Sequence, residues 1–458
     1  MQNLVIRYAH NKNLLCRTLL FATLIIKTMY ILIKDIKKYL NKSITIKGWA
    51  HNIRSSGLIM FIRLRDGTGF IQSIVEKKQI SSSQWEQAQK ISRESSLEIK
   101  GIVKKHPQKK DVFEIQINNL IIYQIADEYP IGKKEHGPDF LLDYRHLWLR
   151  DKKQWAIQNV RNEIIKATYE FLWQNNFIKI DAPILTPTSC EDTTTLFEVK
   201  YFHLGKAYLS QSGQLYLEAG IASHNRVFDF GPTFRAEKSK TRRHLTEFWM
   251  MDAEMAFVEH KENMEIQEQL ISYIIGSVLK NCEQELTILE RDKNKLKRIK
   301  PPFARITYEK AIKKIQKMGS NIKSGDDFGA EDETLITENS QVPVFIEKWP
   351  KNTKAFYMKI DPKNPKLVLG SDLIAPEGYG EIIGASQRED NYEILKKRMI
   401  KEKIPIKEFQ WYLDLRKYGS VPHSGFGYGL ERLTGWICGR KHIRETIPFP
   451  RLINRLTP

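Results

Sequence analysis

The sequence has few cysteines and no long apolar run. Its four cysteines lie far apart and form no C-x-x-C pair: Cys16, Cys190, Cys282 and Cys438. This spacing indicates neither a zinc site nor a disulfide framework, so we expect a reducing compartment, the cytoplasm. The longest uncharged N-terminal run, residues 18–26, is too short to span a bilayer. No internal repeat or low-complexity segment stands out, and no association with a membrane is expected.

Acidic residues are scarce relative to basic ones. Lys and Arg number 73 against 54 Asp and Glu, a net charge of +19. Such an excess favours a polyanionic partner, because phosphate contacts supply affinity that does not depend on sequence. A lysine-rich surface produced by biased codon usage is the alternative explanation for part of it. A length of 458 residues predicts two or three domains, and 41% hydrophobic residues suffice for a sizeable core.

Residues 1–28 contain four basic side chains and no acidic one. Three interpretations are open: a secretory signal peptide, an organellar presequence, or an extension from a start codon assigned too far upstream. No small-x-small cleavage site follows the apolar run, which disfavours the signal peptide. Because Met29 begins a natural entry into a first domain, we prefer the extension and place the presequence next.

Residues 43–125 are rich in short alternating or apolar runs separated by turn residues. They predict five strands, with a hairpin turn at Asp66-Gly67 and one short helix over residues 84–92. Five strands and a helix at this size predict an OB-fold, a small barrel that binds single-stranded nucleic acid, over residues 29–126. Residues 127–150 are rich in proline, glycine and mixed charge, and they read as a hinge.

Residues 151–458 form the predicted second domain. A long amphipathic helix (151–176) precedes a strand (177–185) that contains Pro183, a residue suited to a strand edge because it cannot donate to a ladder. Residues 227–234 and 245–253 predict an antiparallel hairpin with a basic loop at 238–244. Residues 260–352 read as a charged helical insertion. Strands, a helix at 389–402 and a glycine-rich segment complete the chain.

Two places carry chemistry. Arg235 and Glu237 leave the first hairpin strand two residues apart, hence on one face, where a cation and a carboxylate suit a nucleotide. Further on, a Gly-x-Gly-x-Gly run (residues 425–429) opens an apolar helix at Leu430-Glu431-Arg432. A dinucleotide-binding loop is disfavoured there, because no Rossmann-type strand precedes it and no βαβ pattern follows.

These segments resemble the three motifs of class II aminoacyl-tRNA synthetases. The helix, strand and Pro183 resemble motif 1, which builds a homodimer interface. Phe-Arg-Ala-Glu with Arg-His-Leu-Thr-Glu-Phe resembles motif 2, and the glycine run with Glu-Arg resembles motif 3. The resemblance implies an α+β catalytic domain, an antiparallel sheet flanked by helices, in which no enzyme nucleophile is needed.

The same resemblance assigns ATP contacts. Arg235 would meet the α-phosphate, Arg432 the terminal phosphate, and Phe248 would stack on adenine. Arg243 and His244 would hold the outer phosphates or the base, and Glu237 joins Arg235 and Arg432 as a catalytic residue. Asp372 and Glu381 would hold Mg²⁺, which prefers few carboxylates together with phosphate oxygens.

The predicted barrel resembles the anticodon-binding domain of aspartyl-, asparaginyl- and lysyl-tRNA synthetases. Arg54, Phe61 and Gln72 fall where that group grips the anticodon. An arginine can pair with a phosphate, an aromatic ring can stack on an unpaired base, and an amide can form hydrogen bonds with a base edge. Core packing is the alternative for Phe61.

The amino-acid pocket resembles that of asparaginyl-tRNA synthetases of the archaeal and eukaryotic type. Glu191 falls where relatives hold the α-amino group, although the following Asp192-Thr193 departs from the usual sequence. Arg388 falls where relatives bind the side-chain oxygen. Aspartyl enzymes carry Gln-Ser-Pro-Gln-Leu-x-Lys-Gln, whereas this chain keeps Gln214 but has Leu217 for the lysine and Glu218 for the last glutamine. Loss of a cation and gain of an acid disfavour a carboxylate ligand.

We therefore expect asparagine, ATP and tRNA(Asn) as partners. Three alternatives stay open. One is an aspartyl-tRNA synthetase, possibly a non-discriminating one, which Leu217 argues against. Another is an asparagine synthetase of the same fold, which would lack the anticodon domain. The last is a non-catalytic OB-fold RNA-binding paralogue, which would not need Arg235, Glu381 and Arg432.

Overall fold

The computed structural model describes residues 31–132, 134–188, 190, 195–238 and 241–458. The predicted N-terminal extension (1–28) and Glu191 lie outside the described residues. The chain divides between His136 and Gly137 into two compact units, a division that falls inside the segment predicted as a hinge. Each unit is described by itself.

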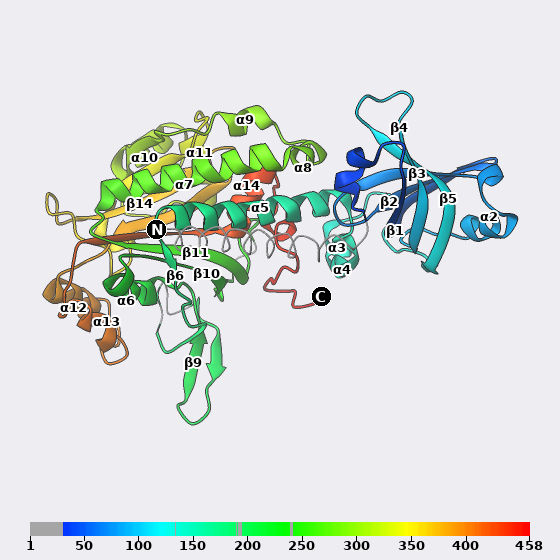
Figure 1. The fold of residues 1–458 in the computed structure, drawn as a ribbon. Coiled ribbons are helices and arrows are strands. Elements are labelled where there is room, and N and C mark those ends of the chain that lie inside the picture. Colours follow the sequence, from blue (N-terminus) through cyan, green and yellow to red (C-terminus); the bar gives the residue numbers. More distant parts are fainter. Residues whose placement is uncertain (1–30, 133, 189, 191–194, 239–240) are drawn as a thin grey trace, which may run out of the picture. The chain divides into compact units, whose positions relative to one another are not determined.

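The first unit is a closed five-stranded barrel (Figure 1). Its strand order is β1-β2-β3-β5-β4, and the core is filled by the inward-facing residues of each strand, such as Ile46, Met60, Ile62 and Leu64. The OB-fold prediction is confirmed, with a helix close to its predicted place. The elements are η2 (Ile33–Tyr39), β1 (Ser43–Ser56), β2 (Ile59–Arg65), β3 (Phe70–Glu76), η3 (Lys77–Gln79), α2 (Ser82–Gln89), β4 (Ser96–Lys105) and β5 (Phe113–Gln124).

The second unit is built on an eight-stranded sheet in the order β12-β13-β14-β15-β16-β11-β10-β6. Neighbouring strands run antiparallel except at the two edges, where β12 pairs with β13 and β6 with β10 in parallel. The strands are β6 (Ile178–Lys179), β10 (Arg226–Phe234), β11 (Glu247–Ala256), β12 (Ala304–Thr307), β13 (Val344–Pro350), β14 (Leu367–Ala375), β15 (Gly380–Gln387) and β16 (His423–Gly429).

Helices α5, α7 and α14 cover one face of this sheet (Figure 1). Asp151 caps the N-terminus of α5 by accepting from the Lys153 and Gln154 amides, an arrangement that stabilises a helix start by about 1 kcal/mol. The helices are α3 (Pro138–Asp143), α4 (Arg145–Trp148), α5 (Lys152–Gln174), α6 (Gln214–His224), α7 (His260–Asn281), α8 (Glu283–Ile288), α9 (Lys293–Lys297), α10 (Tyr308–Lys317), α11 (Ala330–Thr337), η5 (Lys351–Thr353), α12 (Tyr392–Lys401), α13 (Gln410–Asp414), α14 (Leu430–Cys438) and η6 (Ile443–Glu445).

Three sequence expectations need correction. The predicted strand over residues 177–185 is broken: β6 ends at Lys179, β7 (Leu185–Thr186) belongs to a small sheet with β8 (Glu198–Lys200) and β9 (Lys206–Leu209), and Pro183 lies between them. Proline interrupts the ladder because it has no N–H. The hinge segment contains α3 and α4 of the second unit, and Arg145 is buried there against the carbonyls of Ile447 and Pro448.

The third correction concerns the predicted helical insertion. It also contributes β12 and β13 to the main sheet, and its helix α7 packs into the core with Leu270, Ile271 and Ile274 fully buried. The segment is therefore part of the domain's framework. In the described residues, no helix combines the length and apolarity needed to cross a membrane.

Candidate active site

A cavity of about 380 Å³ opens on the face formed by β11, β14, β15 and β16. Most of the residues predicted from the sequence line it, although they come from widely separated segments. They are Gln214, Arg235, Glu237, Arg243, His244, Phe248, Asp372, Glu381, Arg388 and Arg432. Leu217 and Glu218 do not line this cavity.

At one end of the cavity, cations lie beside an aromatic ring. Strand β10 ends at Phe234, so Arg235 and Glu237 belong to the hairpin loop and not to the strand as predicted. The Arg235 guanidinium lies 5.4 Å from the Phe248 ring centroid. Glu237 is 3.4 Å from the His244 ring. Burial lowers the pKa of His244, while Glu237 opposes that shift. An aromatic ring beside a cation suits a purine with its phosphates.

Arg432 reaches the cavity from the first turn of α14. It donates to the Glu381 carbonyl and lies 3.7 Å from the Glu381 carboxylate. Its neighbour Glu431 is buried, accepts from Arg161 at 2.6 Å and also accepts from the Trp249 amide at 3.0 Å. Glu431 therefore fastens α14 to β11 and α5, and this attachment aims Arg432 at the cavity.

The Arg243 guanidinium already has partners within the protein. It pairs with Glu333 of α11 and donates to the Gly378 carbonyl. Burial raises the pKa of Glu333 to about 7, with Glu381 adding to the rise and Arg432 and Arg243 opposing it. The outer-phosphate role predicted for Arg243 therefore requires that this side chain exchange a carboxylate for phosphate oxygens.

The two predicted metal ligands differ in their surroundings. Glu381 is partly exposed in the cavity. Asp372 is buried and accepts from Lys354 at 2.6 Å; burial raises its pKa to about 7, against the opposing effect of Lys354. The described residues contain no cluster of three or more His, Cys, Asp or Glu that could hold a metal ion by itself.

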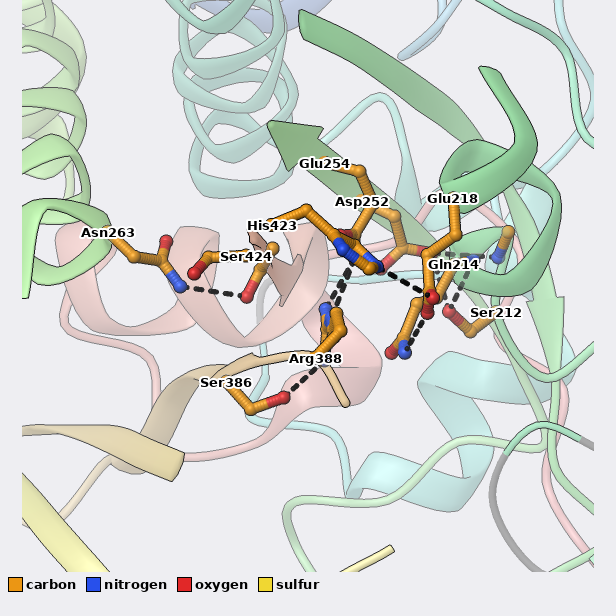
Figure 2. A network of polar contacts seen from close by, with 12 residues as sticks. Ser212, Gln214, Glu218, Asp252, Glu254, Asn263, Ser386, Arg388, His423 and Ser424 are labelled. Atoms are coloured by element: carbon orange, nitrogen blue, oxygen red, sulfur yellow. Dashed lines mark hydrogen bonds and ion pairs between the residues drawn. The ribbon is translucent and has the colours of Figure 1, made fainter. Parts of the chain in front are cut away.

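At the opposite end of the cavity, Arg388 and Glu254 form a buried pair (Figure 2). Arg388 donates from Nε and Nη2 to the same oxygen, Glu254 Oε1, and from Nη1 to Ser386. The other oxygen, Glu254 Oε2, is buried and accepts no hydrogen bond from the described residues. Burial raises the pKa of Glu254 to about 8, although Arg388 opposes that rise.

The glycine run makes room for two carboxylates, those of Glu254 and Asp252. Gly425 lies opposite Glu254, and Gly427 lies opposite Asp252, in the antiparallel pair of β11 and β16. A Cβ at Gly425 would come within 1.9 Å of Glu254 Oε1, and one at Gly427 within 2.2 Å of Asp252 Oδ1. The missing side chains thus make room for two acids of the neighbouring strand.

The predicted contacts of Leu217 and Glu218 with the amino acid need correction. Leu217 is fully buried in an apolar cluster with Ile221 and Val227. Glu218 is buried behind the cavity, where it pairs with Arg416 and accepts from Tyr412 at 2.8 Å. Gln214, Leu217 and Glu218 share one face of α6, since they are three and four residues apart. Gln214 begins the helix and lines the cavity, whereas the next turn carries Leu217 and Glu218 into the core, where Glu218 still accepts from Gln214.

The comparisons with known proteins bear on this geometry. Residues 137–453 match the family model for class II tRNA synthetases (D, K and N), and residues 44–123 match the OB-fold nucleic acid binding domain. Asparagine–tRNA ligases of Pelotomaculum thermopropionicum and Desulforamulus reducens are 54% and 50% identical, over 93% of this chain and 99% of each relative.

A solved structure of Pyrococcus horikoshii asparaginyl-tRNA synthetase, complexed with asparaginyl-adenylate, is 42% identical. It superposes with a TM-score of 0.91 over 94% of this chain and all of that one.

The chain belongs to the asparagine–tRNA ligases.

The barrel of this asparagine–tRNA ligase carries its predicted anticodon residues on the outer surface. Phe61 points away from the core formed by its neighbours Met60 and Ile62, which removes core packing as the explanation for it. The Arg54 guanidinium lies 4.7 Å from the centroid of the Phe61 ring. On the adjacent strand, Gln72 donates to Glu114 at 3.4 Å.

Sequence reasoning missed several residues of the cavity, among them Asp252, Glu254 and Lys354. Asp252 and Glu254 alternate within an otherwise apolar strand, and Lys354 precedes an aromatic segment. Asp252 accepts from Ser212 and from the Gly213 amide, both at 2.9 Å. Two buried acids at i and i+2, matched to two glycines at the same spacing, were a usable signal. Lys354 offered none, because its pairing with Asp372 depends on the tertiary fold.

Proposed function

We propose that this chain activates asparagine with ATP and transfers it to tRNA(Asn). One observation carries the choice of amino acid: the buried acceptor Glu254 Oε2, which lacks a partner among the described residues, lies beside the cation Arg388. A buried polar atom without a hydrogen bond is costly. A ligand that brings an N–H donor to this position relieves that cost.

A carboxamide fits this pair better than a carboxylate. Its oxygen can accept from Arg388 while its N–H₂ donates to Glu254. Against the ionised form of Glu254, an aspartate carboxylate would place a second negative charge and leave Oε2 without a donor. Because a site built to hydrogen-bond a particular group rejects the analogue that lacks it, the pair discriminates strongly. Arg388 and Glu254 thus replace Leu217 and Glu218 as the basis of selection.

The opposite end of the cavity suits the activation step. The asparagine α-carboxylate attacks the α-phosphate of ATP, forming asparaginyl-adenylate and releasing pyrophosphate. The terminal ribose hydroxyl of tRNA then takes the asparaginyl group, and AMP leaves. Arg235 and Arg432 stabilise charge on the phosphates, Phe248 stacks on the adenine, and Glu237 with His244 orients the nucleotide. Positioning and electrostatic stabilisation suffice for both steps.

Mg²⁺ fits one wall of this cavity. Glu381 offers a single accessible carboxylate, which matches the preference of Mg²⁺ for one or two carboxylates with phosphate oxygens. Asp372 commits one oxygen to Lys354 and contributes through its second oxygen. When bound, Mg²⁺ supplies positive charge that offsets the charge of the ATP phosphates.

The barrel supplies the tRNA contact, and motif 1 supplies a homodimer interface. Arg54 and Phe61 offer a cation and an aromatic ring on the outer surface, which suits an unstacked base with its phosphate. Around motif 1, Trp173, Ile178 and Ile184 are exposed large hydrophobic residues, a pattern typical of a surface that a second copy covers. We place the enzyme in the cytoplasm.

The deciding experiment is ATP–pyrophosphate exchange with asparagine and with aspartate. We expect exchange with asparagine and little with aspartate. Stronger exchange with aspartate would identify an aspartyl enzyme. Exchange with neither amino acid, in a protein that still binds tRNA, would identify a non-catalytic RNA-binding protein.

A further inference from the structure

Gln214 lines the cavity, and its side-chain amide has one end bound and one end open. Nε2 donates to Glu218 Oε1 at 3.0 Å, one helical turn away on α6 (Figure 2). The carbonyl oxygen, Oε1, accepts no hydrogen bond from any described residue. Because this oxygen lacks a partner and yet is not one of the buried polar atoms without a partner, it must be accessible to solvent. The open end of the amide is therefore at the cavity.

Glu218 can only accept. Four donors converge on its two oxygens: Tyr412 at 2.8 Å to each oxygen, His423 at 3.1 Å, Arg416, and Gln214 itself. Burial alone would raise the pKa of Glu218, but Arg416 and His423 outweigh it and hold that pKa below its ordinary value. An ionised carboxylate has no proton to offer, so an amide oxygen facing it would be repelled.

The surrounding contacts hold this carboxylate in place. Arg416 donates from Nε to the Glu389 carbonyl at 2.9 Å, and its guanidinium lies 4.2 Å from the Tyr412 ring centroid. The other ring nitrogen of His423 faces the Val421 carbonyl at 2.8 Å. Since Arg416 and His423 are themselves held, they fix the position of the Glu218 carboxylate, and the orientation of Gln214 follows from it.

We propose that Glu218 is a positioning residue that turns the Gln214 carbonyl oxygen toward the bound amino acid and thereby makes Gln214 an acceptor for an N–H group of asparagine. This inference rests on the proposed function. Two groups of asparagine can donate, the α-ammonium and the carboxamide. A carboxylate cannot donate, so a fixed acceptor at this position also disfavours the side chain of aspartate.

The test is a double-mutant cycle with Glu218→Gln and Gln214→Met, read by asparagine-dependent pyrophosphate exchange. Gln at 218 can present either end of its amide, so Gln214 is no longer held. We expect Glu218→Gln alone to raise the KM for asparagine about tenfold, the loss of one well-placed hydrogen bond, with a much smaller change in kcat. In the Gln214→Met background, the same change should alter KM less than about twofold.

Breaking the buried pair with Arg416 could also destabilise the fold, and two measures separate that effect. Glu163→Gln, at a buried carboxylate of α5 that accepts from Ser277 and Asn281, is the matched control and should leave the KM for asparagine unchanged. If Glu218→Gln does not fold, Glu218→Gln combined with Arg416→Met removes both charges and enters the same cycle. Equal KM increases with and without Gln214 would overturn the proposal.

Inhibitors distinguish the two donor groups. Succinamic acid keeps the carboxamide and lacks the ammonium, whereas aspartate β-methyl ester keeps the ammonium and lacks the carboxamide N–H. The inhibitor that retains the group bound by Gln214 should lose about tenfold in affinity in Glu218→Gln. No loss for either would refute the acceptor role. A wild-type enzyme without asparagine exchange would instead refute the proposed function itself.

Discussion

The outer surface of the barrel and the catalytic cavity use arginine in opposite ways. On the barrel, the exposed Arg54 lies over the ring of the half-buried Phe61 and forms no ion pair with a described residue. In the cavity, Arg388 pairs with Glu254 and Arg243 pairs with Glu333, and both pairs are largely shielded from solvent. The first arrangement leaves its positive charge to the ligand, whereas the second neutralises that charge within the protein.

This difference follows from the two ligands. Phosphates of RNA bring many negative charges, so uncompensated cations gain affinity with little dependence on sequence. An amino acid must be told apart from one that differs by a single charge. A buried pair of opposite charges accepts a neutral, polar side chain and disfavours an ionised one, because an uncompensated buried charge costs several kcal/mol.

The largest effect should come from the cations that meet ATP. Arg235→Ala and Arg432→Ala should each lower asparagine-dependent pyrophosphate exchange at least about a hundredfold, since each removes a preorganised charge from the transition state. Filter binding of tRNA(Asn) should be unchanged, because the barrel is intact. Normal exchange in either variant would refute its role and would break the contrast between the two units.

Glu254→Gln tests the neutralised pair. The substitution leaves Arg388 as an uncompensated cation in the amino-acid pocket, so aspartate should bind better and asparagine worse. We expect the ratio of kcat/KM for asparagine over aspartate to fall about a hundredfold, a value set by the loss of a charge-assisted hydrogen bond and the relief of repulsion. An unchanged ratio would show that discrimination resides elsewhere.

The preference for asparagine over aspartate should also depend on pH, with a smaller effect than that of Glu254→Gln and with a sign that the pKa of Glu254 determines. The pKa of Glu254 is raised to about 8, so the carboxyl group is partly protonated near neutrality. Its O–H could then donate to an aspartate carboxylate, and this ability is lost as the pH rises. The asparagine preference should therefore increase about tenfold between about pH 6.5 and pH 8.5. The same profile in Glu254→Gln should be flat; a slope there would assign it to another group.

Sequence patterns predicted the barrel and most of the cavity, because both depend on local periodicity and on three compact motifs. Alternation placed Phe61 on a strand, and the motif order brought Arg235 and Arg432 into one cavity. Patterns failed at Leu217 and Glu218, because a residue's side of a helix depends on where that helix packs. Leu217, where aspartyl enzymes carry a lysine, correctly indicated a missing cation, but the acid beside Arg388 is Glu254 of strand β11 and not Glu218 of helix α6.

The smallest effect should appear on the barrel. Phe61→Ala removes one stacking surface, worth about 1–3 kcal/mol per base, so the affinity for tRNA(Asn) should fall about tenfold while asparagine-dependent exchange stays unchanged. Arg54→Gln should reduce the slope of log K against log salt by about 0.7, one phosphate contact on a single strand. Lys34→Gln is the matched control, because it also removes one positive charge but lies outside the strands of the barrel and far from Arg54 and Phe61 in sequence. If Phe61→Ala charges limiting tRNA as fast as the wild type, the ring does not stack on the anticodon, and the unpaired charge of Arg54 on the barrel surface needs another explanation.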